Sequence, residues 1–339
     1  MQHPVKTVSL EGKAFRITGL SQDDPYFSSI SDGFEPEFSH ICRQVIGKGD
    51  VCVDIGANIG LKSLLLSRFV RAGQVVAIEA NPTVGEILEA NVAASGQGNI
   101  RVVRTAVGDR DGFVHFAGES AYGHIAEAGV RVPVRRLETI LREAGLERAD
   151  FIKIDVEGYE FPILRDSIDL IHRSGAVVLF EFNSWCQLAF SRTSPLEFLE
   201  WIFAHFAFVG RVNREGMGGY LVERMVPGQE LAVLHANLMR DGCVTDILVT
   251  NDADRAATWP ALVQQVAAPP EAAARVEDAL RTERDNAAAG WEKARGERDL
   301  VRRERDAALS ELAALRASRS WRMTAPLRRV LSALRPGRG

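Results

Sequence analysis

From about residue 49 to residue 252 the sequence alternates short β-branched runs with helical stretches, and this alternation restricts the fold more than any other feature. Repeated strand–helix–strand units build a parallel sheet. Because the expected strands are almost entirely apolar, helices should cover both faces of that sheet. The pattern therefore predicts an α/β fold with these strands: Val51–Ile55, Val75–Glu79, Ile100–Thr105, Phe151–Asp155, Ala176–Glu181, Val209–Val212, Tyr220–Val222 and Ile247–Val249.

The composition is that of a globular protein and excludes several functional classes. Hydrophobic residues make up 46% of the chain and charged residues 25%, close to the average for soluble proteins. None of the four cysteines forms a CxxC pair, which argues against a zinc ribbon, an iron–sulfur protein and a disulfide-rich secreted scaffold. The net charge of −4 disfavours a general nucleic-acid binder. Without a signal-peptide core or a long apolar run, the chain is expected to be cytoplasmic.

Three segments precede the C-terminal region. Residues 1–48 are a lead-in, with an expected hairpin around Glu11-Gly12-Lys13 and a helix that ends at Val45. Residues 49–255 hold the alternating strands and helices and form the expected main domain. Residues 256–270 end in two prolines and are expected to be a linker.

Two C-terminal segments differ from the rest in their patterning. Residues 271–317 carry an apolar seam at seven-residue spacing beside a polar seam, which predicts a long helix or a weak coiled coil. A solitary solvated helix is the alternative. Residues 318–339 form a basic amphipathic tail: seven arginines and no acidic residue follow Leu315. Residues 316–339 therefore suit peripheral contact with the inner face of an anionic membrane, although a solubilising tail or a partner-binding helix would have the same composition.

A glycine-rich turn follows the first strand, within residues 51–63. Gly56 and Gly60 leave space for a ligand against the backbone, and the helix that follows presents unpaired N–H groups. The dinucleotide fingerprint needs glycine where Asn58 stands. No Gly-Lys-Ser follows at the spacing of a phosphate-binding P-loop. The turn therefore predicts a ligand-binding loop of another kind, with a purely structural turn as the alternative.

Two further strand ends supply groups suited to a nucleoside. Glu79 ends the second strand, and its two carboxylate oxygens match the two hydroxyls of a ribose. After the third strand, the small turn from Ala106 to Asp109 suits an adenine ring, with the Asp109 carboxylate reaching the amine of the base. A helix cap at Glu79 and an ordinary hairpin turn at Asp109 are the alternatives.

Carboxylates also follow the next two strands. Asp155 ends one strand, Glu157 comes two residues later, and Glu181 ends the following strand. Because open α/β sheets bind ligands at the carboxyl ends of their strands, these three side chains should converge. Three carboxylates in one cleft need protons, a cation or a cationic ligand to offset their repulsion. A helix-capping role is the alternative for Glu157.

Four motifs together resemble the FkbM family of S-adenosylmethionine-dependent methyltransferases. They lie at Asp54–Gly60, Glu79–Pro82, Ala106–Asp109 and Lys153–Glu160, and the resemblance covers about residues 35–250. It implies a Rossmann-like class I methyltransferase with a mostly parallel, seven-stranded sheet and helices on both faces. The C-terminal helix is outside the family core, but the segment from Ser318 to Arg328 resembles tails of bacterial glycan-assembly enzymes.

The resemblance implies S-adenosyl-L-methionine as the cofactor. The residues it matches to the cofactor site are Asp54, Gly56, Ala57, Asn58, Gly60, Glu79, Asn81, Ala106, Val107 and Asp109. Asp155 and Glu157 match the acidic motif between cofactor and acceptor. The chain departs from the family at Lys62, where an aromatic or small residue is usual, and this lysine is expected to face solvent. Phe182-Asn183 stand where the family often has a histidine, which disfavours a histidine-based mechanism.

Methyl transfer to a hydroxyl of a cell-surface glycan or glycolipid sugar is the function that the resemblance and the tail imply. Asp155 or Glu157 would be the base, or these two with Glu181 would hold a divalent cation. His124 is a candidate for the acceptor site, and Tyr26 with Glu37 for a lid. RNA ribose methylation and a non-catalytic adaptor, whose C-terminal helix recruits another copy or a glycan-assembly partner, are the alternatives.

Overall fold

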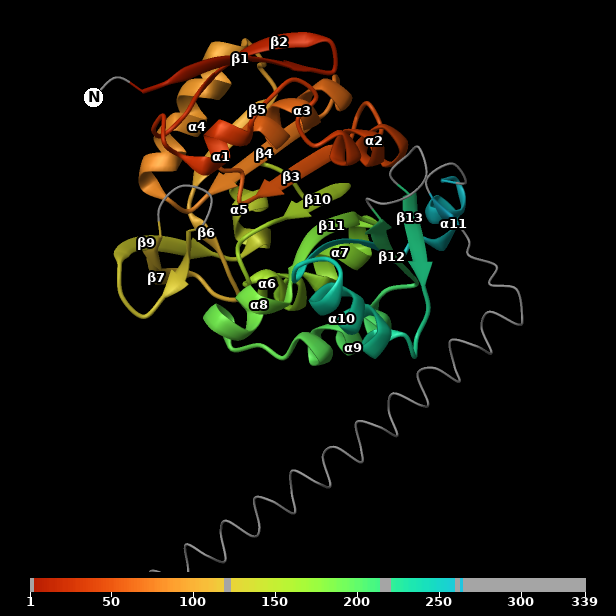
Figure 1. Cartoon of the computed structure of the whole chain (residues 1–339). Helices are drawn as coiled ribbons and strands as arrows, with labels where there is room; N and C mark the ends of the chain where they lie inside the picture. The colour runs from red at the N-terminus through yellow and green to blue at the C-terminus, as the bar shows by residue number, and fades with distance from the viewer. Residues whose placement is uncertain (1–2, 119–122, 214–220, 260–262, 265–339) are drawn as a thin grey trace, which may run out of the picture. The chain divides into compact units, whose positions relative to one another are not determined.

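The computed structural model describes residues 3–118, 123–213, 221–259 and 263–264 (Figure 1). All of these belong to one compact unit that spans residues 1–266. The predicted helix at residues 271–317 and the tail at 318–339 lie outside the described residues. Within the part of the chain that the structure describes, none of the helices combines the length and the apolar character needed to cross a bilayer.

The centre of the unit is a mixed sheet, in which the described residues form nine strands in the order β15-β13-β12-β14-β11-β10-β3-β4-β5. The five from β11 to β5 are mutually parallel. Their bounds are Val177–Asn183 for β11, Phe151–Ile154 for β10, Val51–Ile55 for β3, Gln74–Glu79 for β4 and Ile100–Arg104 for β5. The α/β class and the five parallel strands predicted from the sequence are confirmed.

The other edge of the sheet is mainly antiparallel. β14 (Val244–Thr250) pairs antiparallel with β11 and with β12 (Phe208–Asn213), and β12 pairs antiparallel with β13 (Leu221–Met225). The short strand β15 (Val263–Gln264) then adds parallel to β13. The described sheet therefore has nine strands rather than the seven that the family resemblance implies: β13 overlaps the strand predicted at Tyr220–Val222, whereas β15 was not predicted.

Residues 256–259 and 263–264, in the segment expected as linker, belong to the folded unit. The helix α11 (Ala253–Ala257) leads directly to Trp259, which is only 2% exposed. Its ring packs edge-on against Phe208, with centroids 5.9 Å apart. Burial of a large aromatic side chain ties this segment to the core, so the folded unit extends past residue 255.

Helices cover both faces of the sheet, as the apolar strands require. α2 (Pro36–Val45), α3 (Leu61–Phe69) and α4 (Pro82–Ser95) pack on the face that holds Cys52, Val75 and Phe151. The opposite face, which holds the next residue of each of these strands, is covered by five helices. They are α5 (Leu137–Glu143), α6 (Glu160–Asp166), α7 (Ile168–Ser174), α9 (Pro195–His205) and α10 (Glu230–Met239). Successive strand residues thus enter different cores.

The lead-in packs on the first of these faces. Its hairpin, β1 (Val5–Leu10) and β2 (Lys13–Thr18), lies over α4 (Figure 1). The amide of Asn91 on α4 donates to the Thr18 carbonyl at 3.0 Å and accepts from the Thr18 N–H at 2.8 Å. A short helix, α1 (Pro25–Ser29), joins the hairpin to α2. The hairpin and the helix ending at Val45 therefore form where the sequence predicts them.

A second sheet, which was not predicted from the sequence, follows β5. Its order is β6-β9-β7-β8. The strands are β6 (Ala106–Val107), β7 (Gly112–Ala117), β8 (His124–Ala126) and β9 (Val130–Arg135). The apolar side chains of Phe116, Val132 and Val134 form its small core. This sheet places residues from β6 and β8 beside the carboxyl ends of the central strands.

Candidate active site

A cavity of about 260 Å³ lies at the carboxyl ends of β3, β4, β10 and β11. Its wall combines the glycine-rich turn, the strand-end acids and residues of the small sheet. The predicted site residues in this wall are Gly56, Ala57, Asn58, Glu79, Ala106, Val107, Asp155, Glu157 and Glu181. Most of the acids and small residues chosen from the sequence therefore meet in one place.

The turn after β3 is held tightly between two neighbouring strands. Gly56 has φ +79°, and a side chain there would meet the Asp155 carbonyl oxygen at 1.8 Å. The N–H groups of Gly56 and Ala57 both donate to the Ile78 carbonyl, at 3.0 and 2.9 Å. Asn58 also lies in the left-handed region, with φ +50°. Only glycine fits at position 56, since the backbone leaves no room for a Cβ.

Glu79 connects this turn to β4. Its carboxylate accepts the Asn58 N–H and the Asn81 N–H, each at 2.8 Å. Burial raises the pKa of Glu79, although these hydrogen bonds oppose the shift. The Oδ1 atom of Asn58 is buried without a hydrogen-bond partner among the described residues. A buried orphan acceptor beside a strand-end carboxylate suits a ligand that brings hydrogen-bond donors.

Four residues matched to the cofactor site lie outside the cavity wall. Asp54 is fully buried and accepts the Ser63 hydroxyl at 2.5 Å, which anchors the turn to α3. Gly60 occupies the left-handed N-cap position of α3. The Asn81 side chain caps α4 by accepting from the N–H groups of Thr83 and Val84. Asp109 is exposed to solvent. Asp54, Gly60 and Asn81 therefore stabilise the turn and the helix starts around the cavity, whereas Asp109 lies outside the wall.

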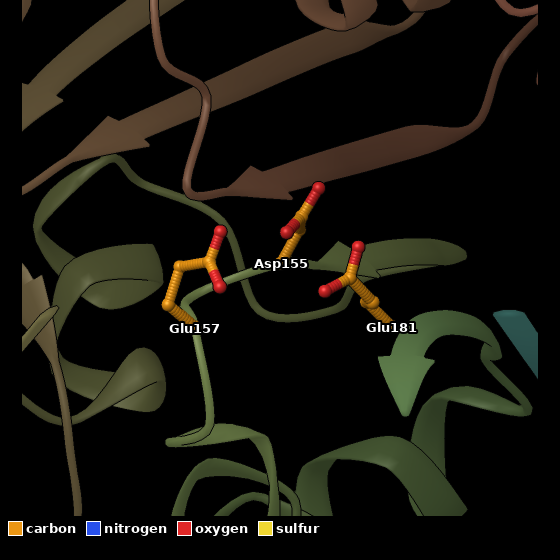
Figure 2. Close-up of side chains that lie close together, drawn as sticks. All are labelled: Asp155, Glu157 and Glu181. Atoms are coloured by element: carbon orange, nitrogen blue, oxygen red, sulfur yellow. The ribbon is translucent and has the colours of Figure 1, made fainter. Parts of the chain in front are cut away.

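The three carboxylates of the predicted acidic group converge (Figure 2), with oxygen atoms within 4.8 Å of one another. Asp155 is distinguished by its partners: Lys153 Nζ lies 2.5 Å and Lys62 Nζ 3.3 Å from its Oδ2. Burial opposes ionisation of Asp155, but the two ammonium groups outweigh burial and hold its pKa below the usual value. Asp155 is therefore a charge-compensated carboxylate.

Glu157 and Glu181 differ from Asp155 because their pKa values are raised rather than lowered. Burial and the neighbouring Asp155 charge raise the pKa of Glu157, whose Oε2 accepts the Cys186 thiol at 3.2 Å. The same two causes raise the pKa of Glu181, on the adjacent strand, well above its usual value. Glu157 also has φ +54°, a strained conformation for a residue with a side chain. Such a strained conformation persists only where the surrounding fold fixes the backbone. In this conformation the Glu157 side chain lines the cavity.

Residues 54–207 match the family model described as "Methyltransferase FkbM domain". This segment of the chain is an FkbM methyltransferase domain. A methyltransferase from Sordaria araneosa is 28% identical over 151 residues, covering 33% of this chain and 58% of its own length. The chain therefore spans less than two-thirds of that relative.

Solved structures also resemble the chain. An FkbM methyltransferase from Methylobacillus flagellatus has a TM-score of 0.39 at 15% identity, over 60% of this chain and 44% of its own. An O-methyltransferase from Bacillus cereus, in complex with S-adenosylhomocysteine, has a TM-score of 0.38 at 15% identity, over 63% and 78% of the two chains.

Lys62 does not face solvent, contrary to the prediction for this departure from the FkbM family. Its side chain is 17% exposed, lines the cavity, and lies 2.9 Å from Glu35 Oε2 as well as near Asp155. Burial opposes its charge, but Glu35 and Asp155 outweigh burial and raise the pKa of Lys62 well above its usual value. The helical pattern around Lys62 does not reveal these ion pairs, because Asp155 directly follows β10 and Glu35 lies in the lead-in.

Two residues of the lead-in line the cavity of the FkbM domain. They are Tyr26, as expected, and Glu35 rather than Glu37. His124 is flanked by Gly123 and Ile125, which line the cavity. The His124 ring itself stacks on Phe190, with centroids 3.7 Å apart and planes 15° from parallel. The lead-in and the small sheet thus complete the part of the wall that the central strands leave open.

Glu160 is a further acid of the FkbM motif whose role the sequence analysis missed. It is fully buried and begins α6, where its Oε1 accepts the N–H groups of Val156 and Gly158 at 3.0 and 3.2 Å. Its Oε2 is buried without a partner among the described residues. Burial raises the pKa of Glu160 to about 7. This carboxyl group supports the loop that carries Glu157.

Glu160 should make the folded protein less stable as the pH rises. Because its pKa is 4.5 in a solvated chain and about 7 when folded, the folded state holds the proton more tightly. The unfolding free energy therefore falls between these two pH values, by about 3 kcal/mol in all. Urea unfolding at pH 5 and pH 8 should show a smaller difference for Glu160→Gln than for wild type. Glu86→Gln, at an exposed site on α4, is the matched control; an equal difference in all three proteins would contradict the assignment.

Proposed function

We propose that the protein transfers the methyl group of S-adenosyl-L-methionine to a hydroxyl oxygen, and that the acceptor is a sugar of a cell-surface glycan or glycolipid. The observation that carries this proposal is the pairing of a glycine turn and Glu79 with Glu157 and Glu181 in one cavity. One end of the wall suits a nucleoside, and the other holds Glu157 and Glu181, which form no ion pair with an ammonium group of the described residues.

The residues present fit this cofactor. Gly56 and Ala57 expose backbone beside the cavity, and Asn58 has a buried oxygen with no partner in the described chain. Glu79 would accept from the ribose hydroxyls, because each of its oxygens can take a second hydrogen bond. When bound, the cofactor supplies a methyl group already activated by a positive sulfonium, so the protein needs no acid to create an electrophile. The acid-rich wall offsets that positive charge.

Glu157 is the residue we assign as base, ahead of Asp155. The lysines at 2.5 and 3.3 Å from Asp155 stabilise its charge and make it a weak proton acceptor. The Glu157 pKa is raised by burial and by Asp155, so it holds a proton more readily. A base that removes the hydroxyl proton late contributes about 10²–10⁴-fold in rate. Orientation of the acceptor oxygen contributes about 7–11 kcal/mol more.

Aromatic rings on segments adjoining the cavity, although not among its lining residues, support an acceptor with a ring face. His124 stacks on Phe190, and Trp185 meets Phe190 edge-on at 5.5 Å. Trp185 is 59% exposed and precedes Cys186, the hydrogen-bond donor to Glu157. Sugar rings present C–H groups that pack on such faces. Because nucleobases stack on aromatic rings as well, RNA ribose remains the second candidate acceptor.

The carboxylate cluster also suggests a second arrangement. Asp155, Glu157 and Glu181 offer three oxygen ligands within 4.8 Å of one another, and oxygen ligands suit Mg²⁺ or Ca²⁺. In this version a divalent cation would orient a diol of the acceptor, and Glu157 would be a ligand rather than a base. The ammonium groups of Lys153 and Lys62 disfavour it, because they already offset the charge of Asp155.

The full chain should label a glycan when it is incubated with radiolabelled S-adenosyl-L-methionine and cell-envelope glycan extract. Product mass analysis should find one added methyl group on a sugar oxygen. Total RNA is the parallel substrate, and salt-dependent labelling of RNA alone would overturn the glycan assignment. Tight cofactor binding without transfer to either preparation would favour the adaptor, whereas no cofactor binding would contradict the methyltransferase proposal itself.

A further inference from the structure

Lys62 joins three parts of the molecule that are distant in sequence. It lies on the first turn of α3, directly after the glycine-rich turn. Its Nζ is 2.9 Å from Glu35 Oε2 in the lead-in and 3.3 Å from Asp155 Oδ2 after β10. All three side chains line the cavity. We call this chain of contacts the Glu35–Lys62–Asp155 bridge.

The backbone and side chain of Glu35 support a specific role for this bridge. Glu35 has φ +44°, in the left-handed region that disfavours a residue with a side chain. It stands at the N-cap of α2, yet its side chain makes no capping hydrogen bond. Short side chains such as Asp or Ser usually cap a helix by accepting from its first turn, and Glu35 does not take this role. Here the carboxylate turns away from α2 and toward Lys62, and the left-handed backbone permits that direction.

The surroundings of Lys62 hold its ammonium group in place. Its side chain is 17% exposed, and its Nζ lies 5.8 Å from the centre of the Phe38 ring on α2. The charged and titratable groups that act on it are Glu35, Asp155, Tyr26 and Asp246. A partly buried cation with two carboxylate contacts in different segments is worth more than an exposed ion pair, because solvent screens it less.

We propose that Lys62 is a positioning residue for the methyl-transfer site: it orients Asp155 beside the transferable methyl group and, through Glu35, fastens the lead-in as the wall of the cavity on the acceptor side. This inference rests on the proposed function. Lys153 contacts the same Oδ2 atom of Asp155, so the loss of Lys62 would change the orientation of Asp155 without leaving it unpaired.

The bridge can be tested without knowing the acceptor. S-Adenosyl-L-methionine and S-adenosyl-L-homocysteine differ by one methyl group and one positive charge, so the ratio of their dissociation constants reports the charge at the methyl position. Lys62→Met removes one positive charge beside Asp155 and should shift that ratio about fivefold in favour of S-adenosyl-L-methionine. Lys62→Arg keeps the charge and should stay near wild type. Titration calorimetry on the full chain measures both ligands.

Hydrogen exchange tests the contact with the lead-in. In the full-length protein, Glu35→Gln and Lys62→Met should both increase amide exchange in residues 24–38 by about tenfold or more. Arg43→Met is the matched control. Arg43 lies on α2, forms an ion pair with Glu11 of the hairpin at 2.7 Å, and does not line the cavity. It should leave exchange in residues 24–38 unchanged.

The possible results separate the bridge from the proposed function. If wild type binds neither ligand, the methyltransferase proposal fails, while the exchange experiment still decides whether the bridge holds the lead-in. If wild type binds both ligands but Lys62→Met leaves their ratio and the exchange unchanged, the bridge inference is wrong and the proposed function stands. If Lys62→Met does not fold, Glu35→Gln decides: normal exchange in residues 24–38 overturns the inference.

Discussion

Replacing Glu157 with Gln should lower the turnover number by about 10²- to 10⁴-fold, the range for loss of a general base. The substitution keeps the size of the side chain and the oxygen that can accept the Cys186 thiol, but removes the group that takes the hydroxyl proton. Because the proposed cofactor contacts lie mainly on the turn after β3 and on Glu79, the dissociation constant of the cofactor should change by less than about threefold. Initial rates with labelled cofactor and calorimetric binding measure the two quantities separately.

Glu181→Gln and an assay with a chelator make this test specific. Glu181 lies in the same cluster but forms no hydrogen bond with Cys186 in the described structure, so its substitution controls for the loss of one negative charge. Equal losses of turnover and cofactor affinity in Glu157→Gln would contradict the assignment of a base. Loss of wild-type activity in EDTA, restored by Mg²⁺, would show instead that the cluster holds a cation.

Gly56→Ala should destabilise the fold by about 4 kcal/mol or more, a size reached only by a few kinds of substitution. The new Cβ would stand 1.8 Å from the Asp155 carbonyl oxygen, and φ +79° adds about 1–2 kcal/mol for any L-residue. Relieving this clash would require the ends of β3 and β10 to separate. That movement would break the hydrogen bond from the Asp155 N–H to the Ile55 carbonyl, which is 3.0 Å long. Urea unfolding measures the loss, and cofactor binding should disappear with it.

Gly96→Ala is the matched control for this substitution. Gly96 ends α4 with φ +67°, and a Cβ there would meet no atom within 4 Å. Its cost should therefore be limited to the backbone conformation, about 1 kcal/mol. Equal destabilisation by the two substitutions would mean that close approach of β3 and the Asp155 loop does not limit residue 56.

Several features of the site could be predicted because they depend on local sequence and on one rule of parallel sheets. Apolar runs that end in Asp54, Glu79 and Asp155 are visible without a structure. Since parallel strands end on the same edge, acids at those ends must approach one another, and the structure confirms that Asp155, Glu157 and Glu181 meet. The glycines at 56 and 60 predicted a turn that leaves space against the backbone. In the structure both glycines have positive φ, a conformation that other residues avoid.

Other features depend on contacts between segments that sequence pattern does not relate. Asp109 has the right residue type after β5, but the turn into the small sheet leaves it exposed. Glu160 could be found only as part of a family motif, and its burial comes from the packing of α6. Trp259 lies two residues after the five-residue helix α11 and before a strand of two residues, so its anchoring against Phe208 has no periodic signal.

By itself, the sequence determined the α/β class, the positions of the parallel strands along the chain and the edge at which the acids gather, because apolar periodicity and strand direction act over short distances along the chain. The tertiary structure alone decided which acids keep their charge. Lys62 reaches Glu35 and Asp155 at 2.9 and 3.3 Å, and Lys153 reaches only Asp155 among the three clustered acids at hydrogen-bond distance. Coulomb energies change steeply over such distances and with burial, so chemically similar carboxylates acquire different roles only once the chain is folded.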